Sequence, residues 1–164
     1  MIAILHNIRS NHNTGSMFRT ADGAGIEKIY LIGTTPTPID RFGRKNKALS
    51  KVSLNAEDYL EWEYFKSITK LLQKLKKEKY TILALEQDKL SKPIFSLKLA
   101  KNSKIALIVG NEVKGLPKSI LERSDKVLDI PMHGKKESLN VSVAFGIAVY
   151  EIASSFWREG IPDR

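Results

Sequence analysis

The sequence contains no cysteine and only three histidines, which excludes several kinds of site at once. Without thiols there can be no disulfide bond, thiolate metal ligand or cysteine nucleophile. The histidines are irregularly spaced, and we therefore expect no metal. No apolar run approaches the length of a membrane span, and no signal peptide precedes the first apolar residues. These absences favour a cytoplasmic protein that does not bind a membrane.

Several motifs for nucleotide binding and hydrolysis are also missing. The first apolar run is not followed by Gly-x-Gly-x-x-Gly, and there is no Walker-type phosphate loop or Gly-x-Ser-x-Gly segment. A dinucleotide site of the Rossmann type, a phosphate-binding loop and a hydrolase elbow are therefore unsupported. A flavodoxin-like mononucleotide site stays open on grounds of fold alone.

Acidic residues are scarce relative to basic ones. The chain has 27 Lys and Arg against 18 Asp and Glu, a net charge of +9. Such a charge suits a polyanionic partner, because neutralisation of phosphates supplies most of the non-specific affinity for nucleic acid. A lysine-rich, solvated surface is the alternative. With 164 residues the chain is long enough to bury a core, and we expect residues 1–164 to form a single domain.

Short apolar runs alternate with segments of helical periodicity. The runs predict strands buried on both faces at residues 1–5, 28–32, 80–85, 105–109 and 127–131. Helices are predicted over residues 14–25, 66–79 and 141–157, with a further start near residue 116. Residues 34–53 are expected to be a basic loop, and aromatic residues between 54 and 65 to pack in a core or interface. This order predicts an α/β fold, a parallel sheet of five strands with helices on both faces.

Unusual residues follow the carboxyl ends of the predicted strands, where ligands bind in open parallel sheets. These ends carry residues 7–15, Gly33-Thr34, Leu85-Glu86, Gly110-Asn111-Glu112 and residues 131–140. We therefore predict a binding site at this rim. The last predicted helix is apolar nearly all round, which indicates that a second subunit covers part of it.

Three segments at this rim match a known family. They are Asn13-Thr-Gly15-Ser-Met-Phe-Arg19-Thr-Ala21 (motif 1), Ile108-Val-Gly110-Asn111-Glu112-Val113-Lys-Gly115-Leu116 (motif 2), and Ile130-Pro-Met132-x-Gly134 with Ser138-Leu139-Asn140-Val141-Ser142 (motif 3). In order and spacing they resemble the motifs of the SpoU–TrmH family of RNA ribose 2′-O-methyltransferases, in the SPOUT class. The similarity runs over essentially the whole chain. Val113 departs from the pattern, because a glycine is common at this position.

The resemblance implies a fold and a cofactor that periodicity does not predict. In this family the last part of the chain passes through a loop and forms a C-terminal trefoil knot, and the protein is a homodimer. S-adenosylmethionine binds in the knot, held largely by main-chain groups. Transferred by position, its neighbours are Leu85, Gly110, Ile130, Met132, Ser138 and Leu139. Core packing is the alternative for the apolar members, and it is compatible with a wall for the adenine ring.

The functional arginine of the family falls on Arg19, with Asn13 and Gly15 shaping its loop. The resemblance assigns Arg19 as the base that accepts the proton of the ribose hydroxyl, activated by the substrate phosphate. Because a guanidinium is effectively always protonated, we favour a role in fixing the phosphate and the hydroxyl. A surface ion pair on a helix would be the alternative for an isolated arginine, and an ordinary turn residue is the alternative for Asn13.

Two further residues, Ser138 and Asn140, resemble the pair that orients substrate and cofactor in the family. Glu112 matches the acidic residue of motif 2, which implies a structural partner across the site. Alternatively, Ser138 caps the last helix and has no other role.

The implied substrate is RNA. Because the chain lacks the separate RNA-binding domain that many ribosomal-RNA members carry, we expect transfer RNA rather than ribosomal RNA, bound through Arg9, Arg41, Arg44 and Lys45. A solvated basic loop is the alternative for the last three. Two other functions on this fold stay open. One is a SPOUT base methyltransferase, which motif 1 disfavours; the other is an RNA-binding protein without catalysis, which the joint presence of motifs 1 and 3 disfavours.

Overall fold

The computed structural model describes residues 1–100 and 102–157. Its strands are β1 (Ile2–His6), β2 (Lys28–Ile32), β3 (Glu61–Phe65), β4 (Thr81–Leu85), β5 (Lys92–Pro93), β6 (Ile105–Val109) and β7 (Lys126–Asp129). They form one seven-stranded sheet in the order β3-β2-β1-β6-β4-β7-β5. Every neighbouring pair is parallel, so the carboxyl ends of all strands meet at one rim.

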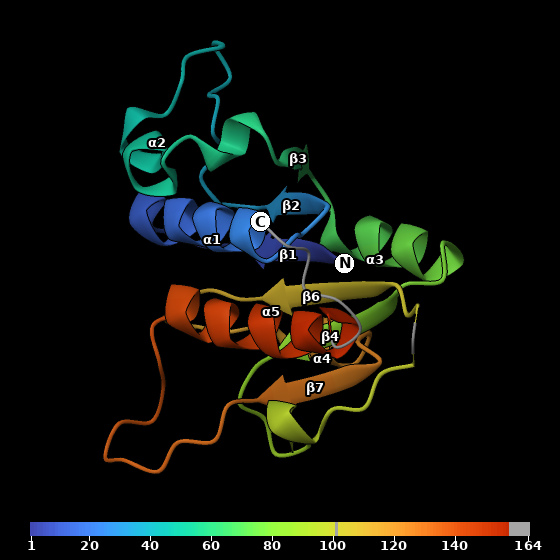
Figure 1. Cartoon of the computed structure of the whole chain (residues 1–164). Coiled ribbons are helices and arrows are strands. Elements are labelled where there is room, and N and C mark those ends of the chain that lie inside the picture. The colour runs from blue at the N-terminus through green and yellow to red at the C-terminus, as the bar shows by residue number, and fades with distance from the viewer. Residues whose placement is uncertain (101, 158–164) are drawn as a thin grey trace.

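Helices cover both faces of this sheet (Figure 1). On one face α1 (Asn11–Gly23) and α5 (Val141–Trp157) lie side by side, and α2 (Lys47–Ser53) packs against α1. The other face holds α3 (Ile68–Lys77) and α4 (Lys118–Leu121). Two short 3-10 turns, η1 (Ala56–Asp58) and η2 (Ile94–Ser96), complete the described elements. The predicted parallel sheet with helices on both faces is confirmed.

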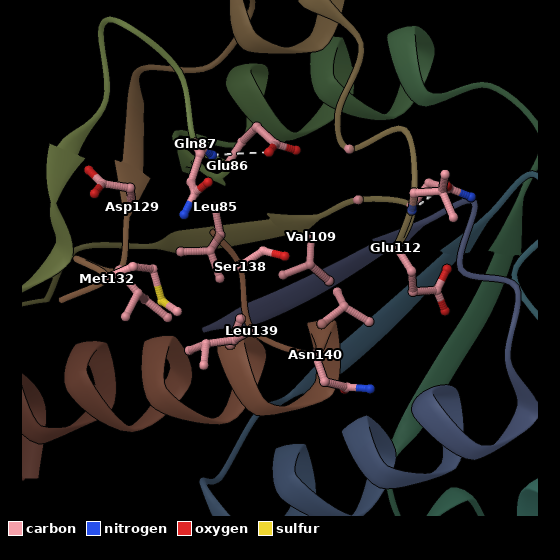
Figure 2. A pocket seen from close by; sticks show the side chains of 17 residues that line it. Leu85, Glu86, Gln87, Val109, Glu112, Asp129, Met132, Ser138, Leu139 and Asn140 are labelled. Carbon is pink, nitrogen blue, oxygen red and sulfur yellow. Dashed lines mark hydrogen bonds between the residues drawn. The ribbon is translucent and has the colours of Figure 1, made fainter. Parts of the chain in front are cut away.

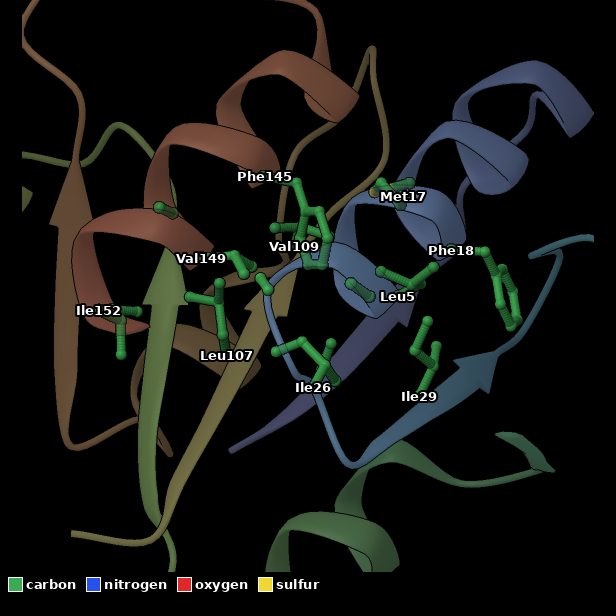
Figure 3. Close-up of a cluster of buried hydrophobic side chains, with 14 of the residues drawn as sticks. Leu5, Met17, Phe18, Ile26, Ile29, Leu107, Val109, Phe145, Val149 and Ile152 are labelled. Carbon is green, nitrogen blue, oxygen red and sulfur yellow. The ribbon is translucent and has the colours of Figure 1, made fainter. Parts of the chain in front are cut away.

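Successive side chains of a strand point to opposite faces of the sheet, so each central strand packs against the helices of both layers. In β1, Ala3 and Leu5 join the apolar cluster under α1 and α5, whereas Ile2 and Ile4 join the cluster under α3. Figure 3 shows the first cluster, in which Phe145 of α5 packs with α1 and the central strands. Complete burial of one such side chain contributes about 1.5–3 kcal/mol. The central strands therefore appear in sequence as uninterrupted apolar runs.

The structure corrects several predicted boundaries. Helix α1 begins at Asn11, not at residue 14, because the Ser10 hydroxyl accepts a hydrogen bond from the Asn13 backbone N–H (3.2 Å). Strands β3 and β5 were not predicted, so the sheet has seven strands instead of five. Helix α2 lies within the segment that was expected to be a loop, and the Asn46 side chain caps it. Within the described ranges, no helix is long and apolar enough to cross a membrane.

Candidate functional site

A cavity of about 290 Å³ opens at the carboxyl ends of β4, β6 and β7. Figure 2 shows side chains from these strand ends and from the start of α5 around the same space. Much of the wall is apolar, formed by Leu85, Val109, Ile130, Met132, Leu139, Val141 and Ala144. The six residues predicted to bind the cofactor all line this cavity: Leu85, Gly110, Ile130, Met132, Ser138 and Leu139.

One wall of the cavity is a tightly folded loop, residues 110–116, which we term the closed loop. The Asn111 side-chain oxygen accepts hydrogen bonds from the backbone N–H groups of Val113 and Lys114 (both 2.9 Å). The Gly115 N–H donates to the Asn111 carbonyl (2.9 Å). Gly115 has φ +64°, and a Cβ there would collide with the Glu86 carboxylate. Both the backbone conformation and the space beside Glu86 therefore favour a glycine.

Glu86 fixes the far end of the closed loop. It follows β4 directly, and its carboxylate accepts hydrogen bonds from the backbone N–H of Leu116 (2.6 Å) and of Gln87 (3.0 Å). Two acceptor oxygens therefore serve two N–H groups from different segments. The same carboxylate lies beside the cavity. The Glu86 carboxylate therefore links the end of β4 to the closed loop, and together they border the cavity.

One residue from each of the three motifs contributes to a hydrogen-bonded network at the edge of the cavity. The Asn13 side-chain amide N–H donates to the Glu112 carboxylate (2.9 Å). The Asn140 amide N–H donates to the Asn13 side-chain oxygen (3.2 Å). Residues from α1, the closed loop and the start of α5 thus meet, although up to 127 positions separate them in sequence. We call these three residues the motif network.

Glu112 determines the orientation of the whole network. Burial alone would raise the pKa of its carboxyl, but hydrogen bonds from Asn13 and from the backbone N–H groups of Glu112, Arg9 and Ser10 outweigh it, so the pKa lies below its ordinary value. An ionised carboxylate only accepts, so the Asn13 amide nitrogen must face it. The Asn13 oxygen then faces Asn140, whose own oxygen accepts from the Ser142 N–H (2.8 Å).

The same geometry settles which residue caps the last helix. Asn140, not Ser138, accepts from the Ser142 backbone and hydroxyl at the start of α5. The alternative that Ser138 is only a helix cap is therefore wrong. Ser138 lines the cavity instead.

Arg19 does not line the cavity. It lies exposed on α1, and among the described residues its guanidinium makes no hydrogen bond or ion pair. The expectation that Asn13 and Gly15 shape a loop is wrong, because both lie within α1. Gly15 instead allows α2 to approach: a Cβ there would lie 2.6 Å from the Leu49 carbonyl oxygen.

The structure separates the four residues that were predicted to bind RNA. The Arg9 backbone N–H donates to Glu112 (3.1 Å), which places Arg9 beside the motif network. Arg41, Arg44 and Lys45 lie in the loop between β2 and α2, near the β3 edge of the sheet (Figure 1). Two of these three are held by carboxylates: Arg44 by Asp40 and Lys45 by Asp58, each at 2.8 Å.

Glu86 and Asn111 are the structural residues that the sequence did not assign. Glu86 directly follows a buried apolar run, and Asn111 lies in motif 2 one residue beyond another, but neither position indicates the hydrogen bonds that the side chain makes. No pattern indicates that Glu86 reaches a backbone N–H 30 positions ahead. Among the described residues, no group of three or more His, Cys, Asp or Glu side chains could hold a metal ion.

The parallel sheet and the cavity at its carboxyl rim define an α/β protein with a cavity above its strand ends, the place where open parallel sheets bind ligands. The family model described as the SpoU rRNA Methylase family matches residues 1–150. The chain belongs to this family.

Two relatives and one solved structure illustrate the similarity. The tRNA (guanosine(18)-2′-O)-methyltransferase of Aquifex aeolicus (strain VF5) is 29% identical over 165 residues, which cover 100% of this chain and 74% of that protein. The 23S rRNA (guanosine-2′-O-)-methyltransferase of Xylella fastidiosa (strain 9a5c) is 31% identical over 151 residues, which cover 92% of this chain and 57% of that protein. The AdoMet-bound rRNA methyltransferase from Sinorhizobium meliloti shares the fold, with a TM-score of 0.84 and 23% identity over 98% of this chain and 57% of that one. The chain thus spans little more than half the length of the last two.

Proposed function

We propose that the protein is an S-adenosylmethionine-dependent RNA methyltransferase that methylates a ribose 2′-hydroxyl, in transfer RNA rather than ribosomal RNA. The motif network carries the proposal, because it joins one residue from each motif at the edge of a single cavity. The names of the Aquifex and Xylella relatives support ribose methylation. The Aquifex relative, whose name specifies tRNA, covers the whole chain, which supports transfer RNA.

The cavity residues fit S-adenosylmethionine. Leu85, Ile130, Met132 and Leu139 provide an apolar wall for an adenine ring, and Gly110 lines the same cavity at the end of β6. The side chains of Ser138 and Gln87 add polar groups at the same cavity. When bound, the cofactor supplies an electrophilic methyl group on a sulfonium centre. The residues that would hold it are the six predicted ones, with Glu86 fixing the border behind them.

We assign the motif network to positioning rather than to proton transfer. Both polar atoms of the Asn140 side chain are engaged, one with Asn13 and the other with Ser142. An amide held at both ends is a rigid group, which suits orientation of a substrate beside the cavity. Arg19 remains exposed and cationic, and we assign it to the phosphate and the 2′-hydroxyl of the RNA.

The strand order supports a C-terminal trefoil knot. β7 pairs with both β4 and β5, yet both precede it in sequence, and the chain returns from β5 to form β6 on the far side of β4. The segment that runs from β4 through β5 to β6 therefore has strands on both sides of β7, and β7 is added between β4 and β5 later in the sequence. We propose that the stretch from β7 to α5 passes through this segment. We further propose that residues 1–164 belong to a single domain.

A homodimer is supported by the outer face of α5. Val143 and Tyr150, two turns apart on this face, are 50% and 46% exposed, whereas Phe145, Val149 and Ile152 are buried against the sheet. An apolar strip of this kind on a helix otherwise packed in the core suits a second copy of the chain. An RNA substrate further supports a cytoplasmic location.

Transfer of labelled methyl groups from S-adenosylmethionine to unmodified transfer RNA and ribosomal RNA, followed by nucleoside analysis, tests the proposal. We expect a 2′-O-methylated nucleotide in transfer RNA, and a loss of about 100-fold or more with Arg19→Ala. Arg123→Ala, an exposed arginine after α4, is the matched control and should retain the wild-type rate. A methylated base would show a different reaction on this fold. Cofactor binding without transfer to any RNA would favour an RNA-binding protein.

A further inference from the structure

The loop between β2 and α2 presents an exposed aromatic ring beside two cations. Phe42 is 66% exposed, although it is a large apolar side chain. The guanidinium carbons of Arg41 and Arg44 lie 4.7 Å and 5.0 Å from the centre of its ring. Both distances are within the range of cation–π attraction. We call these three residues the aromatic platform.

Hydrogen bonds within the turn hold the aromatic platform in place. The Asp40 carboxylate accepts hydrogen bonds from the backbone N–H of Phe42 (2.8 Å) and Arg44 (3.0 Å), and from the Arg44 guanidinium (2.8 Å). Ile39 and Lys45 form an antiparallel bridge below it. Gly43 has φ +77°, which a side chain would disfavour. The Phe42 ring therefore lies on a hydrogen-bonded turn, with the guanidinium groups of Arg41 and Arg44 beside it.

Lys45 anchors the base of this turn to the body of the protein. Its ammonium group lies 2.8 Å from Asp58 and 3.0 Å from the Asn55 side-chain oxygen. Lys45 is therefore committed to holding the turn. By contrast, Arg41 makes no ion pair or hydrogen bond within the described part of the chain, so its charge remains available beside the ring.

We propose that the aromatic platform stacks an unpaired nucleobase of RNA, with Arg41 reaching an adjoining phosphate while Asp40 holds Arg44 beside the ring. The inference rests on the proposed function and adds the structural class of its substrate: a single-stranded loop. Bases in a duplex are already stacked on each other, whereas loop bases are free to stack on aromatic and guanidinium planes. A protein groove fits less well, since it would have to remove two guanidinium groups from water together with the ring.

Binding of two RNA probes tests the inference. One is an RNA hairpin with a single-stranded loop, and the other is a fully paired duplex of the same composition. Phe42→Ala should weaken binding of the hairpin by roughly 5- to 100-fold, the effect of losing one stacked base, and change duplex binding little. Phe95→Ala is the matched control, because Phe95 is similarly exposed (59%) and has no guanidinium over its ring among the described contacts. Equal hairpin affinity of Phe42→Ala and wild type would overturn the inference and leave a protein as the partner of the platform.

A spectroscopic readout separates stacking from a loss of folding. Phe42→Trp places an indole on the platform, and its fluorescence, taken as the difference from wild type, should be quenched by the hairpin but not by the duplex. Phe95→Trp should be quenched by neither. Quenching of both variants, or of neither, would contradict the inference. Methyl transfer by the wild-type protein tests the proposed function separately: transfer without stacking would overturn only the inference, whereas failure of transfer would overturn the function.

Discussion

The two loops that border the cavity differ in how far the protein itself fixes them. The closed loop is held at each end, by Asn111 within it and by Glu86 from the next strand. The second loop, residues 132–140, is exposed from residue 133 onward. Among the described contacts before Asn140, its one side-chain hydrogen bond is from the Gln87 amide to the Glu137 carbonyl (2.6 Å). We call it the open loop.

This difference indicates how each loop should respond when a ligand binds in the cavity. A wall that is already ordered needs no further loss of conformational entropy when a ligand binds. A loop with few internal contacts is ordered only by what it encloses. We therefore predict that the closed loop presents an ordered surface to the ligand and that the open loop takes its final shape around the ligand.

The largest expected effect comes from adding one methyl group to the closed loop. Gly115→Ala forces an L-residue into a left-handed conformation and against Glu86, which displaces a charged hydrogen bond. Together these should lower the free energy of unfolding by about 3 kcal/mol. Gly134→Ala in the open loop is the control: nothing lies within 4 Å of the added Cβ, and a change within about 0.5 kcal/mol is expected. Chemical denaturation of both variants measures the difference, and equal losses would remove the contrast between the loops.

A substitution at Asn13, which joins Glu112 of the closed loop to Asn140 of the open loop, should lower the rate of methyl transfer. Asn13→Asp places a carboxylate where an amide donated to Glu112 at 2.9 Å, so two negative charges face each other. Repulsion should displace residue 13 from Glu112 and with it the oxygen that accepts from Asn140, so methyl transfer should fall by about 100-fold, or about 2.7 kcal/mol in the barrier. Single-turnover kinetics on the RNA substrate measures this. A wild-type rate would show that the motif network has no positioning role.

Glu86→Gln tests the anchor of the closed loop more gently. Glutamine keeps one acceptor oxygen, so one of the N–H groups of Leu116 and Gln87 loses its partner. The free energy of unfolding should decrease by about 1–2 kcal/mol. Glu137→Gln in the open loop should change it little, because it is the Glu137 carbonyl that accepts the hydrogen bond. Thermal unfolding compares the two, and an equal effect would assign no special role to Glu86.

The smallest expected effect is that of pH on Glu112. Its pKa in the folded protein lies below the ordinary 4.5, so its ionised form stabilises the fold above about pH 4.5. That stabilisation is lost as the pH falls through the lowered pKa. Because the side chain is largely exposed to solvent, the contribution should stay below about 1 kcal/mol. The melting temperature of Glu112→Gln should fall less steeply than that of wild type below pH 4.5. Parallel curves would contradict this.

The sequence predicted the central strands well because each is a short apolar run covered on both faces. It failed for β3, where Glu61 and Glu63 alternate with aromatic residues on an edge strand and pair with Lys28. Exposed charges of this kind obscure the strand pattern. Helix α2 was missed because its start depends on the Asn46 cap and not on apolar periodicity. The two-residue strand β5 is too short to leave a pattern.

The site was predictable to the extent that strand ends and motifs mark it. The strand ends and motifs predict the six proposed cofactor neighbours at one rim, and the structure brings them to one cavity. The position of Arg19 outside the cavity, the anchoring of the closed loop by Glu86 and the helix cap formed by Asn140 could not be predicted. They depend on contacts between segments distant in sequence, which no local pattern records.

Hydrogen–deuterium exchange of the two loops, with and without S-adenosylmethionine, tests the central claim most directly. Without cofactor, amides of the closed loop should exchange slowly and those of the open loop rapidly. Addition of S-adenosylmethionine should slow exchange in the open loop strongly and in the closed loop little. Unchanged exchange in both loops at saturating cofactor, or protection confined to the closed loop, would contradict the account.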